Sequence, residues 1–134
     1  KKPRSIAVFG LNGDLDNNRF EFEHIAPQEY RKGFDFWHID IFDYKGEYYS
    51  LVTPERGTEI LLGESEDGIS YNYFNKPLLH SNGIQRVPYI YKASGIVVDG
   101  VFHLFYPSKL KDKKRVHIFC SSIEFEKLLN KLSK

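Results

Sequence analysis

The sequence predicts an all-β fold of consecutive four-stranded antiparallel meanders that ends in one C-terminal helix. Three observations support this prediction. Short runs of aromatic and β-branched residues alternate with turn signals along most of the chain. Two of the resulting units share one pattern at an offset of 54 positions (100 − 46), measured from Gly46 to Gly100. The last residues change from the alternation of a strand to a helical period.

The predicted elements follow one another with short connections. Strands are expected at 5–9, 19–25, 36–42, 47–52, 59–65, 69–74, 89–98, 101–106 and 115–120. Turn signals such as Lys45-Gly46 and Asp99-Gly100 separate neighbouring strands, because glycine accepts a positive φ at no steric cost. Four apolar residues from Phe125 onward recur at i, i+3, i+4 and i+7, which predicts a helix over 122–132. Ser121-x-x-Glu124 in front of it fits a capping box.

The internal repeat suggests a more specific architecture. The offset of 54 aligns five pairs: Trp37 with Tyr91, His38 with Lys92, Asp40 with Ser94, Tyr48 with Phe102, and Leu51 with Phe105. Four-stranded meanders that repeat with a period of about 40–50 residues are typical of β-propeller blades. We expect one partial propeller domain over 1–134, with the end of one blade at 1–27, a second blade at 36–77, a third at 89–121 and the helix at 122–133.

Such a chain would hold fewer blades than the roughly four to eight that close a propeller. We therefore expect the C-terminal part of a longer protein that lacks upstream blades, or an assembly completed between chains. Exposed strand edges would favour self-association. The alternative architecture is a sandwich or open sheet stack with a terminal helix.

Composition excludes some classes of function. The chain has 134 residues, of which 41% are hydrophobic and 16% aromatic, and this suits a globular domain with flat stacking surfaces. The net charge of +1 provides no field for nucleic acid or for an anionic membrane. Cys120 is the only cysteine, so no internal disulfide can form, and its alternation with Val116 and Ile118 predicts a buried thiol. Nothing in the sequence indicates a cellular location.

The candidate site lies on the strand at 36–42. Alternation places His38 and Asp40 on one face of that strand, although a buried unpaired carboxylate is costly. Either the two residues form a structural hydrogen bond, or they line a polar site. The repeat brings Lys92 and Ser94 to the equivalent places of the next blade. Because the inner strands of neighbouring blades face one axis, we expect these four side chains to converge on a central polar cleft near Trp37 and Tyr91.

Several motifs resemble those of the five-bladed β-propeller glycosidases, namely glycoside hydrolase families 32 and 43 and their relatives. The residues that carry this resemblance are Trp37-His38-Ile39-Asp40-Ile41, Gly46-x-Tyr48-Tyr49, Ser65-x-Asp67-Gly68-x-x-Tyr71, Tyr89-x-Tyr91-Lys92-Ala93-Ser94 and Asp99-Gly100-x-x-His103. The resemblance implies a glycosidase-like protein that acts on or binds a carbohydrate. Such enzymes draw acidic residues from several blades, and no complete catalytic set can be mapped onto this chain.

Within this resemblance, Asp40 is the candidate catalytic residue, as a base or an orienting group, and Glu64 is a weaker second carboxylate. The candidate substrate-binding residues are Trp37, His38, Tyr91, Lys92 and Ser94. No metal site and no cofactor are predicted, although the resemblance leaves room for a central structural ion. The alternative function is a non-catalytic carbohydrate-binding or protein-interaction module. Two converging carboxylates would favour hydrolysis, whereas one carboxylate among aromatic residues would favour binding.

Overall fold

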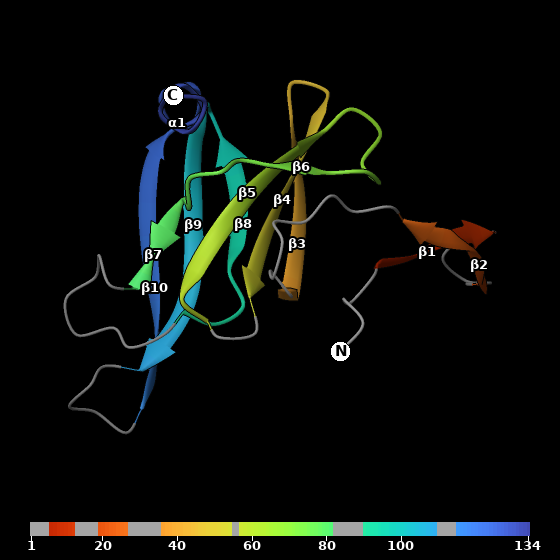
Figure 1. Ribbon diagram of the computed structural model, residues 1–134, viewed down its shortest axis with the longest axis horizontal. Helices are drawn as coiled ribbons and strands as arrows, with labels where there is room; N and C mark the ends of the chain where they lie inside the picture. The colour runs from red at the N-terminus through yellow and green to blue at the C-terminus, as the bar shows by residue number, and fades with distance from the viewer. Residues whose placement is uncertain (1–5, 13–18, 27–35, 55–56, 82–89, 110–114) are drawn as a thin grey trace.

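The computed structural model describes residues 6–12, 19–26, 36–54, 57–81, 90–109 and 115–134. Two antiparallel sheets form the main body (Figure 1), and their strands follow in chain order. The first sheet contains β3 (Phe36–Tyr44), β4 (Glu47–Pro54), β5 (Glu59–Ser65) and β6 (Asn72–Tyr73), and β7 (Leu79–His80) also pairs with β5. The second contains β8 (Ser94–Val98), β9 (Val101–Lys109) and β10 (Val116–Glu124). The predicted all-β meander fold is confirmed.

A separate hairpin joins β1 (Ile6–Asn12) to β2 (Arg19–Ala26). In Figure 1 this hairpin lies on the opposite side of β3 from β8, β9 and β10. The assignment of this hairpin to the end of an earlier blade stays a prediction.

The repeat predicted from the sequence recurs in the strand register. Phe42 faces Tyr49 across β3 and β4, and Ile96 faces His103 across β8 and β9. Ile96 lies 54 positions after Phe42, and His103 lies 54 positions after Tyr49, so the two strand pairs have the same register. The two hairpin turns also match. Lys45 and Gly46 have φ values of 52° and 84°, and Asp99 and Gly100 have 50° and 76°. Positive φ at both central residues defines the type I′ turn, whose twist matches that of the flanking strands.

Several element boundaries differ from the prediction, and three of these differences matter for the site and the helix. The strand expected over 69–74 is reduced to β6 (Asn72–Tyr73), because the preceding residues form the turn around Asp67 described below. The strand expected over 89–98 begins only at Ser94, and its first residue lies outside the described part of the chain. Helix α1 (Phe125–Leu132) begins later than 122, because β10 continues pairing with β9 as far as Glu124 opposite Val101.

The capping box is therefore wrong. Glu124 is the N-cap residue and makes no side-chain capping bond. The first helical amide, that of Phe125, instead donates to the Gly100 carbonyl in the β8–β9 turn at 2.9 Å. The residues at 121–124 are already used by the sheet, and the tertiary partner satisfies a donor that a local cap would otherwise have satisfied.

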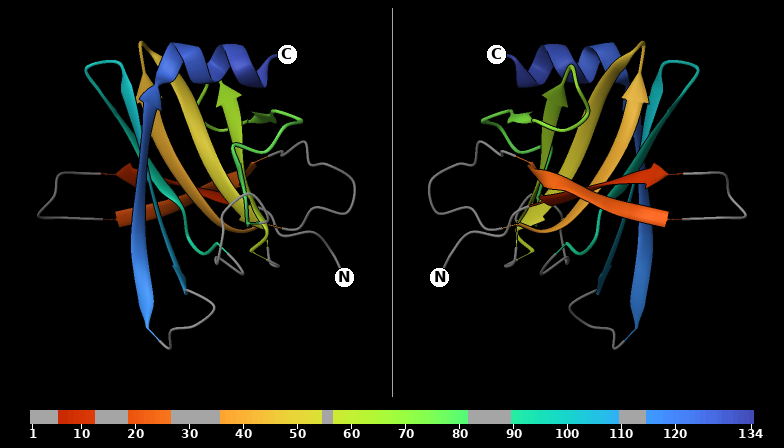
Figure 2. Two further views of the ribbon diagram at one scale, coloured as in Figure 1. Left: turned by 90° about the vertical axis from the view of Figure 1, so that its left-hand side faces the viewer. Right: turned by 90° about the vertical axis from the view of Figure 1, so that its right-hand side faces the viewer.

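The core lies between the two sheets and under α1. Its buried residues come from β4 and β5 on one side, from β9 and the segment before β8 on the other, and from the helix at one end: Tyr49, Leu51, Ile60, Leu62, Ile90, Ala93, Phe102, Leu104, Tyr106, Phe125, Leu128 and Leu132. Figure 2 shows α1 lying across the ends of the strands. The helix thus closes one end of the space between the sheets.

Phe125 is the centre of this closure. Its ring is fully buried and lies 4.8 Å from the Tyr49 ring, 5.1 Å from the Tyr44 ring and 5.5 Å from the Phe102 ring, measured between centroids. The first two contacts are edge-to-face, the arrangement that aromatic quadrupoles favour. One side chain therefore joins both sheets to the helix.

The Ser65-x-Asp67-Gly68-x-x-Tyr71 motif forms the turn that follows β5. Asp67 Oδ1 accepts hydrogen bonds from Ser65 Oγ and from the Ile69 and Ser70 amides, all at 2.8 Å. The Tyr71 hydroxyl donates to the Gly68 carbonyl at 3.0 Å. Backbone donors of Ser70 and Ile69, and then the Ser65 hydroxyl, lower the pKa of Asp67 to about 2. The ionised carboxylate thus holds the turn together.

We expect Phe125→Ala to lower the free energy of unfolding by about 3–5 kcal/mol, because it removes a buried ring and leaves a cavity between three elements. Denaturant titration followed by circular dichroism measures this loss. The matched control is Lys127→Ala on the exposed side of the same helix, for which the change should stay within about 0.5 kcal/mol. Equal losses for the two variants would contradict the central role of Phe125.

The Asp67 turn should make stability depend on acidic pH. The pKa of Asp67 is lower in the folded chain than its ordinary value of 3.8, so its contribution is present above about pH 4 and is lost as pH falls toward 2. Melting temperatures of the wild type and Asp67→Asn should therefore differ at pH 6 and converge near pH 2. The neighbouring Glu66→Gln variant serves as the control. A difference between wild type and Asp67→Asn that did not change with pH would contradict this account.

Candidate functional site

Strands β3 and β8 bring two of the predicted site residues into direct contact. Ser94 Oγ donates a hydrogen bond of 3.0 Å to Asp40 Oδ2. The Gly95 amide donates a second bond of 2.9 Å to the same oxygen. Asp40 is half-buried on the face of β3 that meets β8, so its carboxylate links the edges of the two sheets. The prediction that the repeat brings Asp40 and Ser94 together is confirmed by this contact.

His38 and Lys92 complete what we call the inter-sheet cluster, which consists of His38, Asp40, Lys92 and Ser94. Partial burial is the main cause that lowers the pKa of His38 below 6.5. The Asp40 carboxylate raises that pKa, and the Lys92 ammonium lowers it. Both charges therefore act on the His38 imidazole, which is neutral at pH 7. In a neutral imidazole one ring nitrogen can donate a hydrogen bond while the other accepts one.

Lys92 has an unusual backbone conformation. Its φ is 45°, in the left-handed region that few residues other than glycine adopt. Its Nζ lies 5.3 Å from the centroid of the Tyr91 ring, within the range of a cation–π contact. This geometry joins Tyr91 to the inter-sheet cluster. Outliers of this kind gather at functional sites, where the surrounding structure holds them in place.

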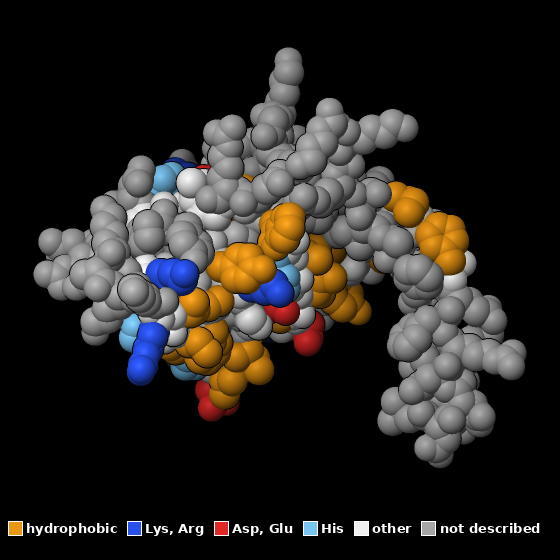
Figure 3. All heavy atoms as spheres, turned by 90° about the horizontal axis from the view of Figure 1, so that it is seen from below, with side chains coloured by type: hydrophobic (Ala, Val, Ile, Leu, Met, Phe, Trp, Pro, Cys, Tyr) orange, Lys and Arg blue, Asp and Glu red, His pale blue; other side chains and the backbone are white. Residues whose placement is uncertain are grey.

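Two aromatic residues near the inter-sheet cluster are open to solvent. Trp37 lies at a β-bulge, where the register with β4 shifts between Phe36 and His38, and its side chain is half-exposed. Tyr91 is exposed to a similar extent. Bulges occur next to binding sites because they re-aim a side chain. Figure 3, seen from below, shows basic, acidic and histidine side chains next to one another among hydrophobic ones.

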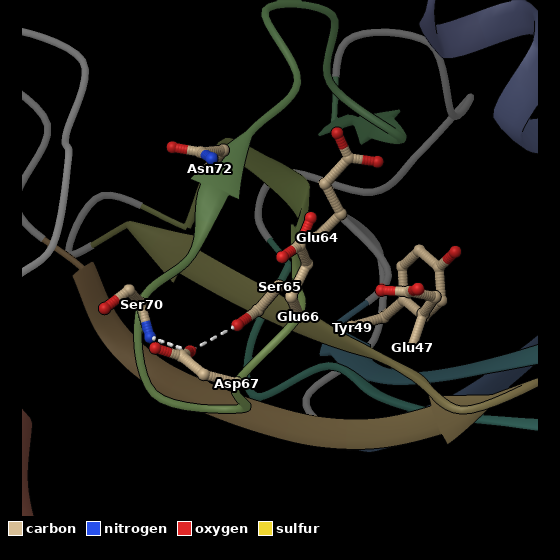
Figure 4. Close-up of a pocket in the computed structure, with 8 residues that line it drawn as sticks. All are labelled: Glu47, Tyr49, Glu64, Ser65, Glu66, Asp67, Ser70 and Asn72. Atoms are coloured by element: carbon tan, nitrogen blue, oxygen red, sulfur yellow. Dashed lines mark hydrogen bonds between the residues drawn. The ribbon is translucent and has the colours of Figure 1, made fainter.

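The predicted second carboxylate, Glu64, lies elsewhere. It lines a pocket of about 610 Å³ beside β5 (Figure 4), together with Glu47, Tyr49, Ser65, Glu66, Asp67, Ser70 and Asn72. Glu64 faces Tyr49 on β4, which in turn faces Phe42 on β3, so two strand spacings separate it from β3. Within the described ranges, no carboxylate is recorded in contact with Asp40. The structure thus does not join Asp40 and Glu64 into a pair of the kind that hydrolysis requires.

Gly95 also contributes to the site, although the sequence patterns did not single it out. Gly95 supplies an amide to Asp40, and a Cβ at this position would come within 2.6 Å of the Phe102 ring and 2.9 Å of Leu51. A glycine here lets β8 approach both the core and the carboxylate closely. The repeat could have indicated this position, because Gly95 directly follows the residue that aligns with Asp40.

Two properties of the described residues bear on cofactors and membranes. Within the residues that the structure describes, no group of three or more His, Cys, Asp and Glu side chains is placed to hold a metal ion. In that same part of the chain, no helix has the length and apolar character that a membrane crossing requires.

Cys120 is exposed, so the prediction of a buried thiol is wrong. It lies on a face of the β8–β10 sheet that no other described element covers.

Comparison with known proteins gives matches at the level of structure. No family model matches the sequence, and no curated protein matches it. The solved structures that superpose on it include a thermostable family-43 glycoside hydrolase, with a TM-score of 0.55 and 15% identity. They also include the GH43_1 enzyme from Xanthomonas citri complexed with xylose, with a TM-score of 0.55 and 13% identity. A third is a GH43 β-xylosidase/α-arabinofuranosidase from a compost microbial metagenome in complex with xylotriose, with a TM-score of 0.58 and 12% identity.

The matches cover 64%, 64% and 69% of this chain, but only 28%, 28% and 32% of the three solved chains. The chain thus spans about a third of their length, and identity this low speaks for the fold alone. The resemblance inferred from the sequence motifs is confirmed at that level: this chain has the fold of part of a family-43 glycoside hydrolase, a five-bladed β-propeller.

Proposed function

We propose that the inter-sheet cluster binds a carbohydrate. The observation that carries this proposal is the hydrogen bond that joins Ser94 to Asp40 between two sheets of glycoside hydrolase-like fold. His38 lies on the same face of β3 as Asp40, and the charges of Asp40 and Lys92 both act on its pKa. A sugar presents several hydroxyl groups, each able to donate and to accept a hydrogen bond. The cluster offers a carboxylate that accepts, an ammonium that donates, and a neutral imidazole that does both.

The aromatic residues fit the same ligand class. The Tyr91 ring contacts Lys92, Trp37 precedes His38 in the chain, and both rings are partly exposed. The apolar face of a sugar ring stacks on such surfaces. Two of the similar solved structures are complexes with xylose and xylotriose. Pentoses and their short oligomers are therefore the first ligands to test.

Binding is favoured over hydrolysis by the state of Asp40. One of its oxygens already accepts two hydrogen bonds from Ser94 and Gly95, so the carboxylate is held in place as a positioned acceptor. Hydrolysis would need a second carboxyl group at about 5–9.5 Å across the bond that is cleaved. Glu64 lines a different pocket. We therefore assign Asp40 an orienting role within a sugar-binding site, and a catalytic role for it would require an acidic residue from outside the described chain.

The test is calorimetric titration with xylose, xylotriose and, for comparison, glucose. We expect Asp40→Asn to weaken binding of the preferred sugar by about 1–3 kcal/mol, because a sugar hydroxyl loses its charged acceptor. Asn keeps an oxygen that can still accept from Ser94 and Gly95, so the fold should be preserved. The matched control is Asp43→Asn, which removes an exposed carboxylate from the other face of the same strand and should leave binding unchanged.

Two results would count against this proposal. If Asp40→Asn lowered the melting temperature while sugar affinity stayed the same, Asp40 would be a structural link between the sheets. If no sugar gave a heat signal with the wild-type chain at millimolar concentration, the interaction-module function would take its place.

A further inference from the structure

The β8–β10 sheet has an apolar face that no other described element covers. We call it the open face, and it comprises Ile96, Val98, Phe105, Ile118 and Cys120. The four apolar side chains are between 40% and 77% exposed, and the thiol is exposed as well. Alternating residues of the same strands, such as Phe102 and Leu104, point to the other face and are buried in the core. Soluble domains rarely leave such a row of large apolar residues in water.

The repeat shows what kind of surface the open face is. On β8 and β9 the offset is 54, so Ile96 corresponds to Phe42, and Phe105 corresponds to Leu51. Phe105 faces Cys120, whereas Leu51 faces Leu62, so the offset on β10 is 58 (120 − 62) and Ile118 corresponds to Ile60. Leu51 and Ile60 are fully buried, and Phe42 packs against the same core. The open face therefore occupies the positions that the β3–β6 sheet buries beneath the β8–β10 sheet.

The complementary surface is also present on this chain. Phe102 is 1% exposed because its side chain points from the β8–β10 sheet into the core between the two sheets. Its counterpart at an offset of 54 is Tyr48 on the outer side of the β3–β6 sheet, which is 40% exposed. Ile41, on the same side, is the counterpart of Gly95 and is 48% exposed. The chain thus has one receiving face and one inserting face, and the core shows how such faces pack.

We propose that the open face binds the Ile41–Tyr48 side of a second copy of this chain. The second copy is the partner that the structure itself supplies with a face of the required kind. The contact is head-to-tail, since different surfaces of the two copies meet. It places β3 of one copy beside β8 of its neighbour, much as β3 and β8 lie together within one chain, and so adds further side chains to the edge where Ser94 lies. This proposal does not depend on sugar binding.

Sedimentation of the full chain over a concentration series tests the proposal, together with two variants. The variant Ile118→Asp places a charge at the most exposed residue of the open face, and Ile41→Asp does so on the opposite surface. We expect the average molecular mass of the wild type to rise with its concentration. Each variant alone should need at least about tenfold higher concentration to reach the same degree of association, since burying an unpaired charge is costly. Mixing the two variants should restore a pair, because each retains the face that the other has lost.

The control is Asn130→Asp, which adds the same charge on the exposed side of α1, outside both faces, and which should associate like the wild type. The single cysteine gives an independent readout: labelling of Cys120 by a bulky maleimide should slow as the protein concentration rises and should prevent association. A wild type that stays monomeric throughout the series would overturn the proposal. So would undiminished association of Ile41→Asp alone, because that result would mean that open faces pair with each other.

Discussion

The structure depends on the apolar contact between two β-sheets that are closed at one end by a short helix. Each sheet is too small to bury its side chains alone, so Leu51 and Ile60 from one side and Phe102 from the other become core residues only when the sheets meet. Phe125 extends this contact to the helix. Two polar contacts attach α1 to the hairpin turns. The Phe125 amide donates to the Gly100 carbonyl in the β8–β9 turn, and Glu126 forms an ion pair of 2.8 Å with Lys45 in the β3–β4 turn. The ion pair is exposed and contributes little, so the buried rings carry most of the stabilisation.

The candidate site is a consequence of the same packing. Once the sheets stack, the first strands of both come together, and the polar residues near their starts must find partners. Asp40 does so by accepting from Ser94 and Gly95, which explains how a carboxylate is tolerated beside a hydrophobic core. The absence of a side chain at Gly95 is what allows β8 to come this close. Site and fold are therefore coupled through a single carboxylate, and a substitution there has to be examined for both stability and binding.

The two-sheet arrangement also has a consequence at its outer surfaces. Because the strand pattern repeats, each sheet has two different apolar faces. One face is of the kind that packs against the sheet that follows it in the chain, and the other is of the kind that packs against the sheet that precedes it. Among the described residues one face of each kind is exposed, with Ile118 on one sheet and Tyr48 on the other. Closed propellers remove this mismatch by joining the first blade to the last. The same physical rule therefore builds the core and leaves surfaces that can associate.

The sequence by itself determined the strand pattern, the places of the two hairpin turns and the 54-residue repeat, because alternation and glycine turns are local properties. The repeat also sufficed to predict that Asp40 and Ser94 approach each other. Only the tertiary structure decided where the helix begins, because β9 extends pairing through Glu124 and overrides the local cap. It also decided that Cys120 faces solvent and that Glu64 lies apart from Asp40, since alternation assigns a residue to a face but does not say which face is covered. That depends on which sheets stack together, and stacking is a property of the whole chain.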